Sequence, residues 1–524
     1  MKVPGYEASV IIAQSPESMS INVDSAIAED RLAVIAERAE IARLQGRQVV
    51  VVQGLGFVGA AVASVVADAR DGGGEPLYFV VGLELPNADG HRKIASVNAG
   101  RTPVISPDSE LSRLTYRASV ERGNLCATTD ERALGLADVI LVDVQLDVAH
   151  PDSANPEEVR ADMTGFERAI RSIGRRMQPD ALVMIETTVP IGACEKIVKP
   201  ILDEERSARS ITAPLLLAHA YERVMPGPRY VDSIRRFWRS FSGIDEESTR
   251  RAREFLESFI KTDEYPLHEL AAPAASELAK LLENSYRAIN IAFIYEWTLL
   301  AEQTGVNLFE VIDSIKVRRG THDNIRYPGF GVGGYCLTKD GALAQWAARQ
   351  LYGLDVTLDM TLRALKTNHR MPLHTLDLLK EVLTPLPGRR VLLCGASYLP
   401  EVGDTRHSPA ELFVNELKRG GAEVLVHDPY VNHWRECPDV PLFGDLERVM
   451  SGVDAVVFAV RHPEYMPLTA DEILKATGKS IAVVDAQNII SDDKADALFR
   501  AGCRVTGVGK GHWRKFGYHQ ARRG

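Results

Sequence analysis

Short apolar runs alternate with helix-length segments along most of the chain. From Gln48 onward the runs are QVVVVQG, LYFVVGLEL, DVILVDV, ALVMIET and LLLAHA, and a second series beginning near Pro387 comprises RRVLLCGAS, AEVLVHDP, DAVVFAV, SIAVVDA and CRVTGVG. Such alternation is typical of parallel sheets covered by helices on both faces. The pattern therefore predicts two α/β sheets in succession.

Two further helices are expected outside these series. The stretch from about Ala272 to Thr304 has no Gly or Pro after Pro273, and at 1.5 Å per residue it would span roughly 50 Å, enough to bridge domains or subunits. Apolar residues also recur at helical spacing over residues 25–45, which predicts an amphipathic helix with no readable partner. We therefore expect an extension over 1–46, an α/β domain over 47–268, a central helical region over 269–386 and a second α/β domain over 387–524.

Composition narrows the class of protein. Apolar residues make up 45% and charged residues 25%, as in ordinary globular proteins, which excludes a disordered or collagen-like chain. Sixty-one basic against 71 acidic residues give a net charge of −10, which argues against a nucleic-acid partner. The apolar window 49–69 is broken by three glycines and fits a strand, a turn and a buried helix better than a membrane span, so no membrane partner is expected.

Six scattered cysteines without a CxxC pair indicate neither a disulfide scaffold nor a metal site, so no bound metal is expected. The first 20 residues also lack the basic-then-apolar pattern of a secretory signal. Together these features predict a reduced protein of the cytoplasm.

A glycine-rich turn predicts a dinucleotide site. Gly54, Leu55, Gly56, Phe57, Val58 and Gly59 follow a predicted strand and precede a predicted helix. Gly54 permits the tight turn, Gly56 lets the backbone approach a pyrophosphate and Gly59 allows close helix packing. Glu84, near the end of the next strand, is placed to accept hydrogen bonds from the adenosine ribose, which favours NAD over NADP.

One cysteine lies in unusual surroundings. Cys336 follows Gly333 and Gly334 in PGFGVGGYCLTKD, where backbone rich in glycine can approach a ligand. The residues after it resemble a helix start, which predicts a lowered thiol pKa and a reactive thiolate. Asp340, four residues on, is expected on the same helical face.

A lysine and an asparagine on the long central helix are candidate partners of that thiol. Lys280 and Asn284 lie four positions apart and so share one face. Both can donate hydrogen bonds to an oxyanion that develops at a carbonyl carbon. A lysine and an asparagine at this spacing usually lie on a solvent-exposed helix face. The motifs around them are what favour a catalytic interpretation.

Several motifs in this order resemble those of the UDP-glucose/GDP-mannose dehydrogenase family. They are GLGFVG, the Asn98–Gly100 stretch before Pro103, ETTVP (186–190), YERVMPG (221–227), the Lys280/Asn284 helix, GVGGYCLTKD and GDTRHSPA (403–410) with Asp428-Pro429 beyond. The resemblance implies two Rossmann-like, doubly wound domains joined by a long central helix. The first would bind NAD, the helix would form the core of a homodimer, and the second would hold the nucleotide of the sugar donor.

The resemblance also implies a reaction, the oxidation of a sugar C6 alcohol to the acid with two NAD. Cys336 would add to the aldehyde to form a thiohemiacetal, and a second oxidation would give a thioester that water hydrolyses. Lys280 and Asn284 would stabilise the oxyanions, and Asp340 would position water or the lysine. By the same resemblance, Thr188 would order water near the nicotinamide and Glu222 is the candidate general base.

Substrate contacts follow from the same resemblance. Arg406, in DTRHSP, would contact the donor nucleotide or diphosphate, together with the backbone at Gly333 and Gly334. Arg319 would reach the sugar site of a neighbouring subunit, and Arg318 and Arg326 are the less favoured candidates for this contact.

Departures from the family pattern bear on the substrate. YERVMPG, with Pro226 where other branches place a second glutamate, resembles the branch that uses UDP-N-acetylhexosamines, such as UDP-N-acetylglucosamine or UDP-N-acetylmannosamine. The usual VPTP is replaced by residues 144–147, and the usual Tyr-Lys of the last domain reads Tyr398-Leu399. Three alternatives remain open: a UDP-glucose 6-dehydrogenase, a two-electron hydroxyacid-type dehydrogenase that does not need Cys336, and a non-catalytic nucleotide-sugar-binding homologue.

Overall fold

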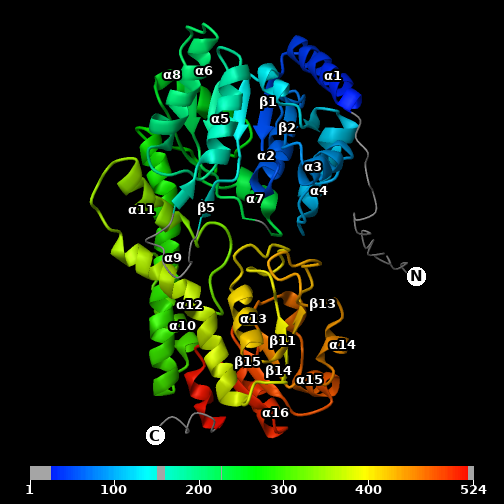
Figure 1. The fold of residues 1–524 in the computed structure, drawn as a ribbon, viewed down its shortest axis with the longest axis vertical. Helices are drawn as coiled ribbons and strands as arrows, with labels where there is room; N and C mark the ends of the chain where they lie inside the picture. Colours follow the sequence, from blue (N-terminus) through cyan, green and yellow to red (C-terminus); the bar gives the residue numbers. More distant parts are fainter. Residues whose placement is uncertain (1–24, 150–159, 226, 517–524) are drawn as a thin grey trace, which may run out of the picture.

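Two α/β lobes lie at opposite ends of a long helix in the computed structural model, which describes residues 25–149, 160–225 and 227–516 (Figure 1). The upper lobe contains the first half of the chain and the lower lobe the last quarter. Helix α9 (Pro273–Thr304) runs from one lobe to the other. The predicted pair of Rossmann-like domains, the central helix and the N-terminal helix are therefore confirmed.

The sheet of the upper lobe has eight strands among the described residues, in the order β10-β9-β8-β7-β4-β1-β2-β3. All neighbours are parallel except β8 with β9. The strands are β1 Gln48–Gln53, β2 Tyr78–Leu83, β3 Leu125–Thr128, β4 Val139–Val142, β7 Leu182–Ile185, β8 Leu216–His219, β9 Ser240–Gly243 and β10 His268–Glu269. All five apolar runs predicted for this lobe are strands; β3, β9 and β10 were not predicted.

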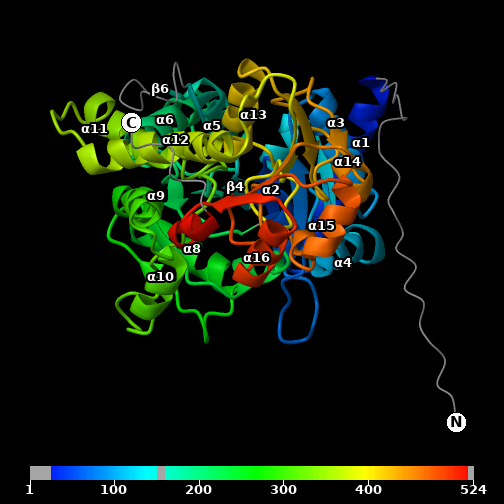
Figure 2. The same ribbon diagram turned by 90° about the horizontal axis from the view of Figure 1, so that it is seen from below.

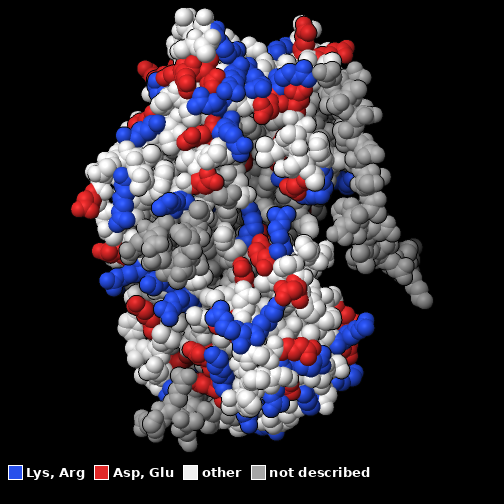
Figure 3. All heavy atoms as spheres, viewed as in Figure 1, with Lys and Arg blue, Asp and Glu red and all other residues white. Residues whose placement is uncertain are grey.

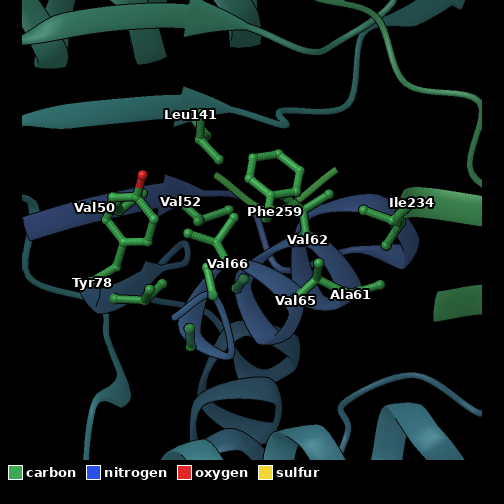
Figure 4. Packing of buried hydrophobic residues seen from close by; sticks show 14 of the residues in the cluster. Val50, Val52, Ala61, Val62, Val65, Val66, Tyr78, Leu141, Ile234 and Phe259 are labelled. Atoms are coloured by element: carbon green, nitrogen blue, oxygen red, sulfur yellow. The ribbon is translucent and has the colours of Figure 1, made fainter. Parts of the chain in front are cut away.

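Both faces of this sheet are buried. On β1, Val50 and Val52 belong to one core and Val49 and Val51 to the other, because successive side chains of a strand point to opposite faces. Figure 4 shows the first core, where valines of β1 lie beside Val62 and Val66 of α2. The elements around the sheet are α2 Phe57–Ala67, α3 Ala88–Asn98, α4 Ser109–Tyr116, η1 Arg117–Glu121, η2 Glu131–Leu136, the hairpin β5 Asp147–Ala149 and β6 Arg160–Asp162, α5 Thr164–Arg176, η4 Cys194–Val198, α6 Lys199–Ala208, α7 Tyr230–Arg235 and α8 Glu246–Glu257.

The N-terminal helix α1 (Ser25–Leu44) packs on the outer side of the upper lobe. Ile35, Ala39 and Ala42 are buried there in the second core. The guanidinium of Arg38 lies 5.2 Å from the centre of the Phe79 ring on β2. The sheet of the upper lobe is therefore the partner that the sequence did not reveal.

The central region consists of four helices: α9, α10 Leu308–Lys316, α11 Asp340–Gln350 and α12 Asp359–Val382. Helix α9 ends where the sequence predicts, because Gly305 adopts the left-handed conformation (φ 77°) that caps a helix C-terminus. Helix α12 crosses α9 and leads into the lower lobe (Figure 1).

The lower sheet has six parallel strands among the described residues, in the order β13-β12-β11-β14-β15-β16. Its five longer strands match the predicted runs, and the two-residue β13 was not predicted. Figure 2 shows this lobe from below, with its helices around the sheet. The elements are β11 Arg390–Cys394, α13 Pro409–Arg419, β12 Glu423–His427, β13 Leu442–Phe443, α14 Leu446–Met450, β14 Ala455–Phe458, η5 Pro463–Tyr465, α15 Ala470–Thr477, β15 Ala482–Asp485, α16 Asp492–Arg500, β16 Arg504–Gly507 and η6 Gly511–Phe516.

The loops that follow the first strand of each sheet meet between the lobes. Arg406, in the loop after β11, lies with its guanidinium 5.0 Å from the ring of Phe57, in the turn after β1. Figure 3 shows acidic and basic side chains gathered at this waist. No helix among the described residues is long and apolar enough to cross a membrane.

Candidate active site

The glycine turn after β1 has the geometry of a pyrophosphate cradle. Gly54 has φ 101°, and a Cβ there would come within 2.5 Å of the Asp143 carbonyl oxygen. A Cβ on Gly59 would lie 1.9 Å from the Gly54 carbonyl oxygen, so neither position accepts a side chain. Above Gly56 there is open space, and Gly56 caps α2 without a side-chain hydrogen bond, which leaves helix N–H groups free for an anion.

Glu84 lies at the end of β2, beside this turn. Its Oε1 accepts hydrogen bonds from the Leu55 backbone N–H at 2.7 Å and from Lys93 Nζ at 2.9 Å. The carboxylate is thus fixed where an adenosine ribose would lie in a Rossmann domain. The residues of this turn fit a dinucleotide. Gly56 leaves room for the pyrophosphate, and Glu84 offers a carboxylate to the ribose of NAD.

The loop that carries Cys336 packs against the lower lobe. A Cβ on Gly333 would lie 2.5 Å from the Tyr398 Cβ, and one on Gly334 (φ 83°) would lie 2.7 Å from the Tyr398 ring. The two glycines therefore allow close contact with the loop after β11, besides any approach to a ligand. The Gly334 N–H donates to the Arg406 carbonyl at 3.1 Å, which joins this loop to the lower lobe.

Cys336 is the one exposed cysteine, and the other five are buried. Helix α11 begins only at Asp340, so Cys336 precedes it by a turn in which the Asp340 N–H donates to the Cys336 carbonyl at 3.0 Å. The expected lowering of the thiol pKa is not found. Protein packed around the thiol raises its pKa, Asp340 adds to the shift, and Lys280 opposes it.

Lys280 projects from α9 toward Glu222. Its Nζ donates to the Glu222 carbonyl oxygen at 2.8 Å, lies 3.9 Å from the Glu222 carboxylate and lies 5.4 Å from the centre of the Tyr221 ring. Burial opposes the charge on this lysine, but Glu222, Cys336 and Asp340 outweigh it and raise the pKa. Lys280 is therefore a buried ammonium group near the thiol.

Asn284 and Asp340 form the second part of the cluster. Asn284 Nδ2 donates to Asp340 Oδ2 at 2.7 Å, and Lys339 Nζ lies 3.2 Å from Asp340 Oδ1. Both carboxylate oxygens are thus engaged by donors other than Lys280. The arrangement fixes the orientation of the Asn284 amide, and it adds a buried cation, Lys339, that the sequence reasoning missed although it lies next to Asp340 in the motif.

Arg406 lies between the two lobes. Asp404 holds its guanidinium through contacts of 3.0 Å to Nε and 2.8 Å to Nη2, and the Phe57 and Tyr335 rings lie 5.0 and 5.4 Å away. Burial opposes its charge, but Asp404 prevails and raises the pKa. The predicted phosphate ligand is therefore placed between the glycine turn and the cysteine loop.

The remaining predicted residues lie as follows. Thr188 is half-buried in the turn after β7, beside Thr187, whose hydroxyl donates to the Val144 carbonyl at 2.8 Å. Arg319 is exposed after α10. Pro226, on which the choice of branch partly rests, lies outside the described residues.

Three further residues near the site were given no role from the sequence, although Tyr335 and Tyr398 lie in family motifs. Lys93 pairs with Glu84, Tyr398 packs on Gly334, and the Tyr335 hydroxyl donates to the Leu146 carbonyl. The last contact connects the cysteine loop to the segment that replaces VPTP. Only the tertiary fold brings these groups together.

Comparison with known proteins agrees with this geometry. Three models of the UDP-glucose/GDP-mannose dehydrogenase family match the chain in order: the NAD binding domain at residues 48–256, the central domain at 274–370 and the UDP binding domain at 392–492. The matches cover both lobes and the helix between them. Helix α1 lies before the first matched residue.

Individual relatives match over nearly their whole length. A UDP-N-acetyl-D-mannosamine dehydrogenase of Pyrococcus horikoshii is 32% identical over 88% of this chain and 99% of its own. An NDP-N-acetyl-D-galactosaminuronic acid dehydrogenase of Ralstonia solanacearum is 26% identical over 84% of this chain and 96% of its own. The crystal structure of an enzyme of the latter name from Methanosarcina mazei superposes with a TM-score of 0.72 at 28% identity, covering 91% of this chain and 98% of that one. A solved UDP-D-ManNAc dehydrogenase of P. horikoshii gives 0.74 at 30% identity, covering 88% and 100%. With the glycine turn, the buried lysine and the exposed thiol in place, the chain belongs to the UDP-glucose/GDP-mannose dehydrogenase family.

Proposed function

We propose that the protein is an NAD-dependent nucleotide-sugar 6-dehydrogenase that oxidises a UDP-N-acetylhexosamine to the uronic acid in two steps. The observation that carries this proposal is the exposed Cys336 thiol beside a buried ammonium group, Lys280, and the anchored Asn284 amide. An enzyme that removes one hydride needs no such nucleophile. A four-electron oxidation needs one, because an aldehyde yields a second hydride readily only after a nucleophile has added to it.

The chain's own groups supply the covalent chemistry. NAD, when bound at the glycine turn, accepts the hydride in each oxidation. The Cys336 sulfur adds to the aldehyde carbon, the S–H proton is released and the thiohemiacetal oxygen develops negative charge. Lys280 and Asn284, which lie one helical turn apart on α9, are the proposed donors for that oxygen.

The thiohemiacetal oxyanion re-forms its C=O bond as the carbon gives up a hydride, which leaves the thioester, and hydrolysis of this thioester completes the sequence. Water loses a proton to Glu222, its oxygen adds to the thioester carbon, and the C–S bond breaks to return the Cys336 thiolate, which takes up a proton. The position of Glu222 supports this role, because its carboxylate lies after β8 and 3.9 Å from Lys280 Nζ. Thr188 would order the water, and Asp340 would orient Asn284 and Lys339.

The substrate class is supported by relatives named for N-acetylated sugars, the mannosamine and galactosaminuronic acid dehydrogenases. Arg406, near the glycine turn and the cysteine loop, is the proposed ligand of the donor diphosphate. A UDP-glucose dehydrogenase is the alternative substrate assignment.

We further propose that the protein is a cytoplasmic homodimer. Six apolar side chains on α9 are each at least 46% exposed: Leu278, Leu282, Tyr286, Phe293, Trp297 and Leu300. An exposed apolar stripe of this kind marks a surface for protein–protein contact. Arg319, exposed after α10, is the proposed contact to the sugar site of the partner. All six cysteines are free, as a reducing compartment requires. The division at residues 46, 268 and 386 is our proposal for the domain boundaries.

The decisive experiment counts NADH against sugar. Purified protein is supplied with NAD and, in turn, UDP-N-acetylmannosamine, UDP-N-acetylglucosamine, UDP-N-acetylgalactosamine, UDP-glucose and GDP-mannose. Two NADH per sugar acid formed would support the four-electron reaction. One NADH per sugar would favour a two-electron dehydrogenase, and binding of UDP-sugar without any NADH would favour a non-catalytic homologue.

Replacing Trp297 with Asp should convert the dimer to a monomer in light scattering, whereas replacing the exposed Arg349 with Ala should not.

A further inference from the structure

Two carboxyl groups meet at the ends of neighbouring strands in the upper lobe. Val142 on β4 pairs in register with Ile185 on β7, so the next residues, Asp143 and Glu186, are cross-strand neighbours. Asp143 Oδ2 and Glu186 Oε2 are both shielded from solvent and have no donor among the described residues. Two acceptors cannot satisfy each other unless a proton lies between them.

Charged side chains lie near this pair on the sides of β8 and β9. Glu186 Oε1 is bound by Arg239 Nη1 at 2.5 Å, just before β9. The negative charge of Glu222, after β8, disfavours ionisation of both carboxyl groups. Lys280 on α9 lies 3.9 Å from Glu222. From the side of β1, the glycine turn contributes backbone only, with Asp143 Cβ 3.1 Å from a Cβ built on Gly59.

Charge arithmetic shows what a single proton does here. Three ionised carboxylates (Asp143, Glu186 and Glu222) against two cations (Arg239 and Lys280) would leave one uncompensated negative charge in a shielded place, which is costly. One proton makes the group neutral. The surroundings agree: burial, Glu186 and Glu222 together raise the pKa of Asp143 well above its usual range.

We propose that Asp143 and Glu186 share one proton at working pH and serve as a positioning pair for the reaction. They keep the buried charge around Glu222 balanced, so that the Lys280 ammonium remains available to the developing oxyanion. This inference rests on the proposed function for its catalytic part and stands without it for the shared proton.

Loss of that proton has a definite effect. At high pH the pair gains one negative charge, which competes with the oxyanion for the Lys280 ammonium group. The rate of the chemical steps should therefore fall as the pair ionises. Asp143→Asn keeps the shape and a hydrogen-bond donor to Glu186 but has no proton to lose.

The shared proton is tested without substrate. Infrared spectra of the full chain should show a protonated carboxyl C=O band at neutral pH that is absent from Asp143→Asn and retained in Asp180→Asn, an exposed aspartate at the other end of β7. A band that is equally strong in all three proteins would overturn the inference. Because no turnover is needed, this result is independent of whether the proposed function holds.

The positioning role is tested by the pH profile of kcat. In Asp143→Asn the alkaline limb should move upward by about one pH unit or more, because the added charge can no longer form, while the acid limb and the Km for NAD change little. Glu186→Gln, which likewise leaves two carboxylates against two cations, should also move the alkaline limb upward, whereas Asp180→Asn should leave the pH profile unchanged. Superimposable alkaline limbs in wild type and Asp143→Asn would refute the role.

Discussion

Asn284 and Asp340 are separated by 56 residues in the chain and joined by a hydrogen bond of 2.7 Å between the amide Nδ2 and the carboxylate Oδ2. This bond ties α9 to the start of α11, directly after the cysteine loop. It therefore sets the direction in which the Asn284 amide points relative to Cys336.

Asn284→Asp should lower kcat about a hundredfold, because it removes an oxyanion donor and sets two carboxylates against each other. Steady-state NADH formation measures the loss, and circular dichroism checks the fold. Asn290→Ala, on the same helix, serves as the control and should retain the wild-type rate. An Asn284→Asp enzyme with normal kcat would remove Asn284 from the site.

Cys336→Ser should abolish formation of the sugar acid while NAD and UDP-sugar still bind with nearly unchanged affinity. The thiol is needed for the thioester, whereas neither nucleotide site is built from it. Product analysis and calorimetry measure the two effects. Cys503→Ser, a buried cysteine of the lower lobe, is the matched control, and full acid production by Cys336→Ser would be fatal to the mechanism.

Alkylation of Cys336 should be slow at neutral pH and accelerate as pH rises through a value above that of a free thiol. The thiolate reacts, and the surroundings raise the pKa of this thiol. Lys280→Met should move the transition to still higher pH, since the lysine lowers the pKa, and Asp340→Asn should move it down. Mass spectrometry after timed iodoacetamide treatment gives the rates. Shifts of the opposite sign in the two variants would contradict the arrangement of charges.

Arg406→Ala should weaken binding of a UDP-sugar roughly ten- to hundredfold, the loss expected for a charge-assisted hydrogen bond of about 1.5–3 kcal/mol. The variant also releases Asp404 from its partner, so Arg406→Lys is included to separate charge from geometry. Arg419→Ala removes an exposed arginine of the same lobe and should bind normally. Equal affinity in all four proteins would place the diphosphate elsewhere.

His374 and Glu302 connect α12 to α9, with His374 Nε2 2.7 Å from Glu302 Oε2. Burial opposes the charge, but Glu302 outweighs it and raises the pKa of His374. A raised histidine pKa stabilises the fold fully below the unfolded value of about 6.5, and this contribution disappears as pH rises through the folded pKa. His374→Gln should therefore lower the melting temperature at acid pH and much less at alkaline pH. A pH-independent difference would show that the pair is not ionic.

The repeating elements of the fold were readable because each depends on local pattern. All ten predicted strands and the end of α9 at Gly305 follow from apolar runs and a capping glycine. Strands β10 and β13 were missed because they have only two residues each, whereas β3 (LCAT) and β9 (SFSG) were missed because they lack the apolar runs of the equally short β4 and β7. Their positions depend on the edges of sheets already formed, which no local signal records.

The site was readable only as far as motifs reach. Cys336, Lys280, Asn284 and Asp340 were named from spacing and resemblance, and the structure brings them together. The direction of the thiol pKa was predicted wrongly, because burial of the thiol and the nearby Asp340 raise the pKa, and helix α11 starts four residues after the cysteine. Lys339, Tyr398 and the Asp143–Glu186 neighbours depend on strand register and loop packing, which the sequence alone does not specify.

Helix α1 closes one side of the upper lobe with Ile35, Ala39 and Ala42, and it precedes the part of the chain that the family shares. Shortening the chain to that shared region would expose Phe79 and its apolar neighbours to water, and the shortened enzyme would tend to aggregate. Whoever produces this dehydrogenase for assays should keep the leading segment from residue 25 onward.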